Sequence, residues 1–140
     1  YIGRGLDYAM SMEGALKLKE ISYIHCEAYA AGELKHGTIS LIEPGTPVIA
    51  LATDPALFEK TESNLREVGS RGAQVTLICP EGVEVPEESA GEIIRLPECS
   101  APARLFASML AVQMIAYEAA SFRGCDIDRP RNLAKSVTVE

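Results

Sequence analysis

The chain has 140 residues, of which 47% are hydrophobic and 24% are charged. These values are typical of one globular α/β domain with a single core, and they exclude an intrinsically disordered protein. The formal net charge is −7, and the acidity is concentrated in residues 81–98, which hold six glutamates and one arginine. Because nucleic acids and anionic membranes are bound through basic patches, neither is an expected partner.

The first half of the chain predicts a strand, a helix and a second strand. A strand end at 1–3 is followed by a helix over 8–24, for which Asp7 is the predicted N-cap. Residues 25–37 are rich in alanine and glycine and are predicted to be irregular, with one short helical turn. The next apolar run, 48–52, predicts a buried strand.

The second half of the chain also alternates between predicted helices and strands. Residues 56–71 are predicted to form a helix at the solvent edge, with Glu62 among the charged residues on its outer face. Further buried strands are predicted at 75–79 and 92–96. A long, mostly apolar helix is predicted at 105–122, and an irregular tail follows it.

Strands that alternate with helices and are apolar on both faces predict a parallel sheet covered on both sides. The order β-α-β-α-β-β-α is typical of a flavodoxin-like three-layer αβα sandwich, formed by residues 1–140 as one domain. Ligands of such sheets bind beyond the carboxyl ends of the strands. The turn Gly3-Arg4-Gly5 lies at that edge, although a lone Gly-x-Gly is only a weak signal for a phosphate loop.

The four cysteines are widely spaced and form no C-x-x-C or C-x-x-H pair, so no zinc site is expected. We predict that all four are reduced thiols in a cytoplasmic protein. No segment has the pattern of a signal peptide, and the apolar run 105–120, which contains Gln113 and Glu118, is too short to span a bilayer. No P-loop or complete dinucleotide fingerprint is present. The sequence therefore predicts no metal, no cofactor and no membrane association.

A narrow group of charges on the helix 8–24 is the most informative feature of the sequence. At about 100° per residue, Glu13, Lys17 and Glu20 lie within roughly 60° of one another, and apolar residues fill most of the remaining circumference. A helix that is apolar nearly all round is normally buried. One interpretation is a surface ion pair with one more acid. The other is a protected general base beside an amine, since a carboxylate against an apolar wall has a raised pKa.

Two histidines and one lysine are the other candidates. His36 lies on a flexible loop just before Gly37, and loops often carry function, whereas His25 is expected to pack or to bond to the backbone. Either histidine can also be purely structural. Lys135 in the tail is either an ordinary surface lysine or a partly desolvated amine that forms a Schiff base with a carbonyl.

Two long segments carry a resemblance to a known family. EGALKLKEISYIHCEAYAAGELKHG (13–37) and DIDRPRNLAKSVTVE (126–140) closely resemble the C-terminal part of the glucosamine-6-phosphate synthase family, also called glutamine–fructose-6-phosphate aminotransferases (isomerising). The resemblance covers the whole chain in order, although its middle, roughly 54–100, is generic. It implies a sugar isomerase (SIS) lobe with a five-stranded parallel sheet, the second of two such lobes. It also implies a fragment of a longer enzyme, with 126–140 as an active-site tail.

The same resemblance implies partners. An N-terminal glutaminase domain would release ammonia. The isomerase half, which includes the N-terminal SIS lobe, would add that ammonia to fructose 6-phosphate and isomerise the product to glucosamine 6-phosphate. A homodimer is expected. The family's main phosphate-binding loop and its glutaminase nucleophile lie outside this chain, so the fragment alone is expected to have no synthase activity.

The resemblance also implies roles for single residues. Glu20 resembles the general base that moves a proton between C1 and C2, and Lys17 resembles the neighbour that assists it. His36 resembles the histidine that opens the sugar ring, reaching the site from the other subunit. Lys135 resembles the lysine that forms a Schiff base with the open-chain ketose, and Ala134 would bring a backbone group to the sugar.

One departure and two alternatives accompany the resemblance. Thr38 stands where the family usually has proline, which implies a slightly more mobile loop with the same chemistry. A SIS-type sugar-phosphate deglycase or isomerase without a glutaminase stays open, and so does a non-catalytic sugar-phosphate sensor. A sensor needs binding groups but no base, so the joint presence of Glu20, Lys17 and Lys135 counts against it.

Overall fold

The computed structural model describes residues 1–131, and within these residues the chain forms a five-stranded, parallel sheet. The spatial order is β2-β1-β3-β4-β5, the order of flavodoxin-like doubly wound sheets. The predicted parallel sheet is therefore confirmed. The strands are β1 (Ile2–Gly3), β2 (Tyr29–Ala30), β3 (Pro47–Leu51), β4 (Gln74–Pro80) and β5 (Glu92–Leu96).

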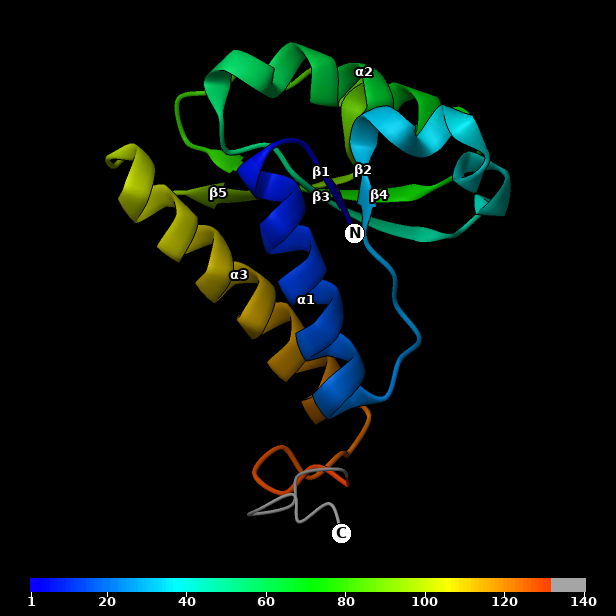
Figure 1. Cartoon of the computed structure of the whole chain (residues 1–140), viewed down its shortest axis with the longest axis vertical. Helices are drawn as coiled ribbons and strands as arrows, with labels where there is room; N and C mark the ends of the chain where they lie inside the picture. The colour runs from blue at the N-terminus through cyan, green and yellow to red at the C-terminus, as the bar shows by residue number, and fades with distance from the viewer. Residues whose placement is uncertain (132–140) are drawn as a thin grey trace, which may run out of the picture.

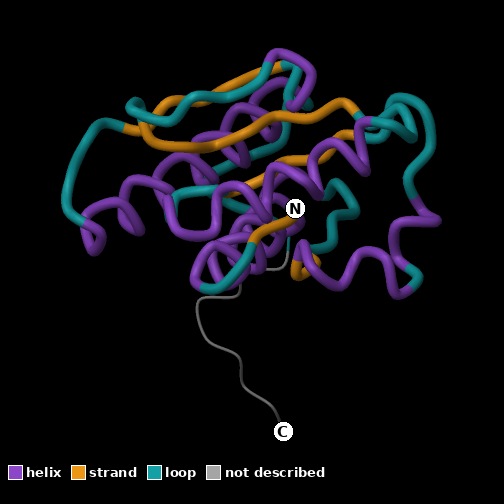
Figure 2. Tube along the Cα trace, turned by 90° about the horizontal axis from the view of Figure 1, so that it is seen from above, coloured by secondary structure: helices purple, strands orange, loops and turns teal. Residues whose placement is uncertain are grey.

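Helices cover both faces of this sheet (Figure 1). Helices α1 (Leu6–Ser22) and α3 (Ala101–Phe122) pack side by side on one face, and α2 (Phe58–Gly69) lies on the opposite face. Figure 2 shows the same arrangement by secondary structure, with the strands next to one another and helical segments around them. The predicted three-layer αβα sandwich is confirmed. Short 3₁₀ helices complete the described chain: η1 (Ala31–His36), η2 (Thr38–Leu41), η3 (Pro55–Leu57) and η4 (Glu87–Ser89).

Each face of the sheet has its own hydrophobic core. On the α2 side, Leu65 and Val68 are fully buried against the sheet. On the other side, Ala15 of α1 packs with Val112 and Ala116 of α3. Because most of these residues are small, α1 and α3 approach each other closely.

Gly14 sets how closely α1 approaches α3. A Cβ atom at this position would lie 3.0 Å from Cβ of Val112 and 3.0 Å from Cε1 of the Tyr1 ring. Carbon atoms in contact prefer about 3.5–4.0 Å. The packing of α1 therefore requires glycine here, although glycine lowers helix propensity.

Helix α1 begins at Leu6, so the prediction of Asp7 as the N-cap is wrong. Gly5 occupies the N-cap position with a φ of 56°, a conformation that glycine adopts freely. Asp7 lies inside the first turn, where its buried carboxylate accepts hydrogen bonds from the Thr53 N–H (2.8 Å) and hydroxyl (2.6 Å). Burial raises the pKa of Asp7, although these hydrogen bonds oppose the shift. The pair joins the start of α1 to the loop that follows β3.

Strand β2 lies in the segment predicted to be irregular. It consists of two residues and pairs with β1, and the Tyr29 N–H also donates to the Tyr1 carbonyl at 2.9 Å. This strand exists because of a long-range pairing, since two residues carry no periodicity of their own. The short helical turn predicted for the same segment is confirmed as η1.

Glu62 is buried, so its predicted place on the outer face of α2 is wrong. Its carboxylate accepts a hydrogen bond from the Ser89 hydroxyl at 2.5 Å and another from Arg66. Ser89 belongs to η4, which packs over α2. The segment that buries Glu62 is therefore far from it in the sequence.

Helix α3 is longer than predicted, because it begins at Ala101 with Pro102 in its first turn, where proline is favoured. Its 22 residues are long enough and apolar enough to cross a membrane by length and composition alone. The argument that its apolar run is too short is therefore wrong. Length and composition alone are weak evidence for a membrane span, and one side of α3 packs against α1 and the sheet.

Candidate functional site

The charged wedge (Glu13, Lys17 and Glu20) lies along one side of α1. The Lys17 Nζ is 2.8 Å from Oε2 of Glu20 and 3.6 Å from Oε1 of Glu13. The hydrogen bond with Glu20 is the main reason that the pKa of Lys17 is raised, so the ammonium stays charged at neutral pH. Two carboxylates therefore share one positive charge.

The wedge is open to solvent in this chain. Between 34% and 38% of each of its side chains is exposed, so the prediction of a buried helix is wrong on this side. Met12 and Leu16, also on α1, are exposed as well. Among the described residues, the wedge is therefore a surface ion pair with one more acid, the first of the two interpretations given above. A protected base and amine require another protein surface to cover this side of α1.

The arrangement suits proton transfer next to a stabilising charge. A carboxylate such as Glu20 can accept a proton from a carbon acid placed against it. The Lys17 ammonium can stabilise the negative charge that such a removal creates. Because Lys17 is charged, it suits this electrostatic role better than nucleophilic attack, which requires a neutral amine.

The structure does not bring His36 to the wedge. His36 ends η1, on the α2 side of the sheet, whereas α1 lies on the opposite face (Figure 1). Its side chain is exposed, and its Nδ1 is 2.7 Å from Oε2 of Glu33. His25 is also exposed, with Nε2 4.0 Å from Glu27, and no hydrogen bond joins its side chain to the backbone of residues 1–131. The prediction that it packs or bonds to the backbone is therefore wrong.

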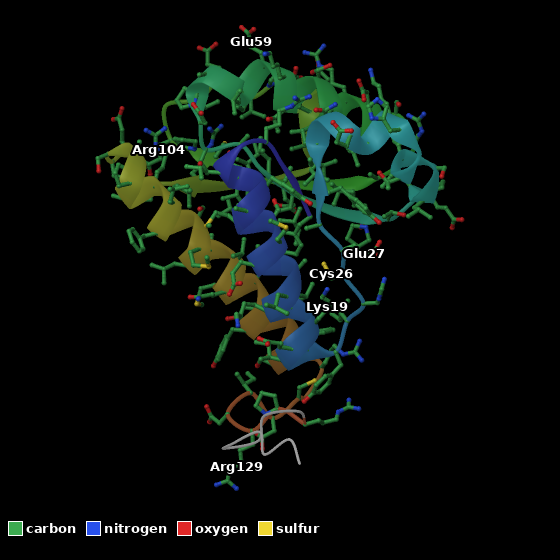
Figure 3. All side chains as sticks on the ribbon, in the orientation of Figure 1. Lys19, Cys26, Glu27, Glu59, Arg104 and Arg129 are labelled. Carbon is green, nitrogen blue, oxygen red and sulfur yellow. The ribbon has the colours of Figure 1, made fainter. Side chains whose placement is uncertain are left out.

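The carboxyl edge of the sheet holds a cavity of about 530 Å³ with mostly apolar walls, which include Leu57 and Leu105. The polar groups there bond one another: Asp7 accepts from Thr53, and the Thr53 carbonyl accepts from Arg104 Nη1 at 2.8 Å. Figure 3 shows Arg104 near the start of α3. Since these groups are already engaged, the edge offers little to an anionic ligand.

Arg4, in the Gly3-Arg4-Gly5 turn, has a structural role. Its Nε and Nη2 donate to Oδ1 of Asn64 at 3.2 and 2.9 Å. The guanidinium packs on Gly32, where a Cβ atom would lie 3.0 Å from Arg4 Nη1. Arg4 therefore ties the loop after β1 to α2 and η1, and these contacts give no support to a phosphate loop.

Residues 1–131 contain no group of three or more histidine, cysteine or acidic side chains placed to hold a metal ion. All four cysteines of the chain are free.

Comparisons of the chain with known proteins show which family it belongs to. Residues 1–122 match the family model described as the SIS domain. The chain belongs to the SIS domain family. The SIS domain is 56% identical over 140 residues to the glutamine–fructose-6-phosphate aminotransferase (isomerizing) of Clostridium acetobutylicum, and 54% identical to that of Bacillus subtilis. These alignments cover 100% of this chain and 23% of each relative, so the chain spans about a quarter of the length of the curated relatives.

Solved structures agree with the assignment of the SIS domain. The C-terminal domain of glucosamine-fructose-6-phosphate aminotransferase from Francisella tularensis matches with a TM-score of 0.81 and 39% identity, over 91% of this chain and 36% of that one. A glucosamine-6-phosphate deaminase from Thermotoga maritima matches with a TM-score of 0.71 and 28% identity, over 99% and 39%. The resemblance to the C-terminal part of the glucosamine-6-phosphate synthase family is therefore confirmed.

The SIS domain exposes a stripe of large apolar side chains along α3, here called the α3 stripe. Phe106, Leu110, Met114 and Tyr117 are 74%, 63%, 55% and 47% exposed. Their spacing places them on one side of the helix, away from the buried Val112. Exposed apolar surfaces mark contacts with other proteins or membranes, or ligand-binding grooves. The sequence predicts the helix but not which of its apolar sides stays open.

Ala134 and Lys135 lie outside the described residues. The last described residue, Arg131, lies beside the C-terminal end of α1, where its N–H donates to the Tyr23 hydroxyl at 2.9 Å. Sequence reasoning missed Tyr23, because no periodicity or motif marks its backbone conformation.

Proposed function

We propose that this SIS domain is the C-terminal lobe of the isomerase half of a cytoplasmic glutamine–fructose-6-phosphate aminotransferase, which converts fructose 6-phosphate and glutamine-derived ammonia to glucosamine 6-phosphate. The observation that carries the proposal is the 54–56% identity to such enzymes across the whole chain. The 2.8 Å contact between Lys17 and Glu20 supports it. The isomerisation moves a proton between adjacent carbons, which calls for a base beside a stabilising charge.

In the proposed reaction, His36 of the partner subunit opens the sugar ring by taking a proton from the anomeric hydroxyl and returning one to the ring oxygen. The neutral amine of Lys135 attacks the C2 carbonyl, and loss of water leaves a Schiff base. Ammonia then displaces the lysine and leaves an imine at C2. Glu20 removes a proton from C1 while the imine nitrogen takes up a proton, which gives an enolamine. Glu20 then returns its proton to C2 as the C1 hydroxyl loses its proton, which leaves an aldehyde at C1 and an amine at C2. Lys17 stabilises the charge that develops, and Ala134 offers a backbone group to the sugar.

The open surfaces of the domain support the proposed partners. The wedge needs a cover to become a protected site, and the α3 stripe needs an apolar neighbour. His36 lies on the opposite face of the sheet from the wedge, which supports its delivery to Glu20 from a second copy of the chain. The N-terminal SIS lobe of the same polypeptide, in a homodimer, would meet these needs, and the glutaminase domain would supply ammonia.

The test uses the complete enzyme that contains this chain and measures glucosamine 6-phosphate formed from fructose 6-phosphate and glutamine. Glu20→Gln is expected to lower kcat by about 10²-fold or more. The thermal midpoint should fall only slightly, because the Lys17–Glu20 ion pair that it removes is partly exposed to solvent. The matched control is Glu59→Gln, which makes the same change on the opposite, α2 side of the sheet (Figure 3) and is expected to leave turnover unchanged.

Two results would contradict the proposal. Turnover that survives Glu20→Gln would remove Glu20 from the role of base. A wild-type enzyme that forms no glucosamine 6-phosphate would reject the function itself. The 140-residue chain alone is expected to form none, since it lacks the glutaminase and the other lobe.

A SIS-type deglycase is the second candidate, because the Thermotoga maritima glucosamine-6-phosphate deaminase shares the fold at 28% identity. The higher identity to the aminotransferases favours the first candidate. Glutamine separates the two: an aminotransferase releases glutamate from it, whereas a deglycase acts on the amino sugar phosphate without it. A sensor would bind the sugar phosphate with no turnover at all.

A further inference from the structure

The side chain of His36 makes a contact that the proposed reaction does not use. Its Nδ1 lies 2.7 Å from Oε2 of Glu33. Both residues belong to η1, a 3₁₀ helix, in which side chains three residues apart are eclipsed. The geometry of the helix therefore places the Glu33 carboxylate against the imidazole ring of His36.

The carboxylate decides which nitrogen of His36 carries the proton. A glutamate that is ionised at neutral pH only accepts hydrogen bonds, so Nδ1 of His36 donates to Glu33. In the neutral imidazole, the other nitrogen, Nε2, then keeps a free lone pair. Nε2 is therefore the atom of His36 that can take a proton from a substrate.

Helix η1 gives this pair a firm support. Ala31 and Leu34 are buried in the core on the α2 side of the sheet. The Nζ of Lys35 lies 2.7 Å from Oε1 of Glu67 on α2. Figure 1 shows this segment beside α2. Because the backbone of η1 is held in this way, the contact with the carboxylate restricts the remaining freedom of the His36 ring.

The pair itself is open to solvent. The side chains of His36 and Glu33 are 73% and 69% exposed. An exposed pair of this kind contributes little to stability, typically less than about 1 kcal/mol. Its exposure makes the imidazole available to a molecule held outside this domain, such as a sugar bound to another copy of the chain.

We propose that Glu33 is a positioning residue: its carboxylate accepts the Nδ1–H of His36 and so presents Nε2 as the base that opens the ring of fructose 6-phosphate on the partner subunit. The inference rests on the proposed function, because that function assigns ring opening to His36. It adds a residue that touches no atom of the sugar.

The proposed step is a proton transfer through Nε2. Nε2 takes the proton of the C2 hydroxyl, the C2–O5 bond breaks with its electron pair going to O5, and a C2 carbonyl forms. The proton then moves from Nε2 to O5. Between the two transfers His36 is an imidazolium, which the Glu33 carboxylate stabilises and keeps in place.

The experiment measures the turnover of two substrates by the complete enzyme, fructose 6-phosphate and 5-deoxyfructose 6-phosphate. The second substrate lacks the hydroxyl that closes the furanose ring, so it needs no ring opening. Glu33→Ala is expected to lower kcat for fructose 6-phosphate about tenfold or more, with KM within about twofold of wild type, because a misplaced base acts poorly. The kcat for the 5-deoxy substrate should stay within about twofold of wild type.

Three further variants complete the comparison. Glu33→Gln keeps an oxygen that can accept from Nδ1 and is expected to lose less activity than Glu33→Ala. His36→Ala removes the base and should show the same selective loss, to a greater extent. Glu43→Gln is the matched control, because Glu43 is also an exposed glutamate, in the loop after η2. It should leave the turnover of both substrates unchanged.

A second measurement reads the position of the proton directly. The 140-residue chain has two histidines, so its ¹⁵N NMR spectrum with isotope-labelled histidine is simple, and His25→Asn assigns the signals. At a pH where the ring is neutral, His36 should carry its proton on Nδ1, and Glu33→Ala should move the population toward Nε2–H. A wild-type proton on Nε2 would overturn the proposal. This result decides the matter if the complete enzyme does not turn over the 5-deoxy substrate.

The kinetic outcomes distinguish this inference from the function on which it rests. A selective loss in His36→Ala together with wild-type turnover in Glu33→Ala would overturn the positioning role and leave the proposed function standing. An equal loss on both substrates in Glu33→Ala would show a purely structural role and would also overturn it. Wild-type turnover of fructose 6-phosphate in His36→Ala would remove ring opening from His36, and this inference with it, while the glucosamine 6-phosphate formed would leave the aminotransferase function in place.

Discussion

The substitution Gly14→Ala tests the packing that holds α1 in place. In a free helix this change stabilises by about 1 kcal/mol, because alanine is the better helix former. Here the added methyl would meet Val112 Cβ and the Tyr1 ring at 3.0 Å. Val112 cannot turn away, because its Cβ is fixed to the α3 backbone and a β-branched side chain has one preferred rotamer in a helix.

The magnitude follows from these two effects. Overpacking of a tight contact costs about 1–3 kcal/mol. We therefore expect Gly14→Ala to lower the free energy of unfolding by about 1 kcal/mol after the propensity gain. Gly69→Ala is the control, because a Cβ atom at the end of α2 would meet nothing within 4 Å. It is expected to raise the free energy of unfolding by about 0.5–1 kcal/mol.

The assay is urea denaturation of the 140-residue chain followed by circular dichroism. The midpoint should fall for Gly14→Ala and rise for Gly69→Ala, with the same slope for both. If Gly14→Ala raised the midpoint as much as Gly69→Ala, the close contact between α1 and α3 would not exist in solution.

Three other predictions concern the loop, the wedge and the α3 stripe. Thr38→Pro changes the first residue of η2 and should stabilise the chain by about 0.5–1 kcal/mol in the same urea assay. Proline suits a first helical turn. The substitution also removes a hydroxyl that is buried without a hydrogen-bond partner among the described residues. Thr38→Val, which removes the hydroxyl alone, is its control, and a loss of stability in Thr38→Pro would show that the backbone does not suit proline. The pKa of Lys17 is raised chiefly by its hydrogen bond with Glu20, so the pair stabilises the fold below about pH 10.5 and loses that contribution as the pH rises through the folded-state pKa. Glu20→Gln should lower the Lys17 pKa measured by NMR titration, and equal values would mean that the pair does not form. Leu110→Asp should leave the stability of the 140-residue chain within about 0.5 kcal/mol, because this side chain is 63% exposed, yet lower the thermal midpoint of the complete enzyme by several degrees. An unchanged midpoint would exclude the α3 stripe as a covered surface.

Local sequence patterns predict much of this fold, because most of its elements are long enough to show a period. The apolar runs that become β3, β4 and β5 and the helices α1, α2 and α3 are recognisable without any tertiary information. Strand β2 is not, because Tyr29 and Ala30 become a strand only through pairing with β1. The burial of Glu62 also depends on a distant segment, which brings Ser89 to its carboxylate.

Part of the candidate site can also be predicted from local sequence, and part of it depends on distant segments. Glu13, Lys17 and Glu20 are neighbours on one helix, so helical spacing alone predicts that they meet, as the structure confirms. Their exposure to solvent depends on which surface covers α1, and the spacing of residues in the sequence gives no information about that surface. Tyr23 was missed because a left-handed backbone conformation at a tyrosine, and its contact with Arg131, arise from the path of the whole chain.

The position of β1 has a consequence for how the domain folds. Although β1 is the first strand of the chain, it lies inside the sheet, between β2 and β3, and has two residues. It cannot complete its pairing until β3 has formed, and pairings between distant segments are the slow part of folding. Since β1 leads directly into α1, the helix that carries the wedge is secured late during folding. In hydrogen exchange, the start of α1 should accordingly open before the amides of β3 and β4 at the centre of the sheet.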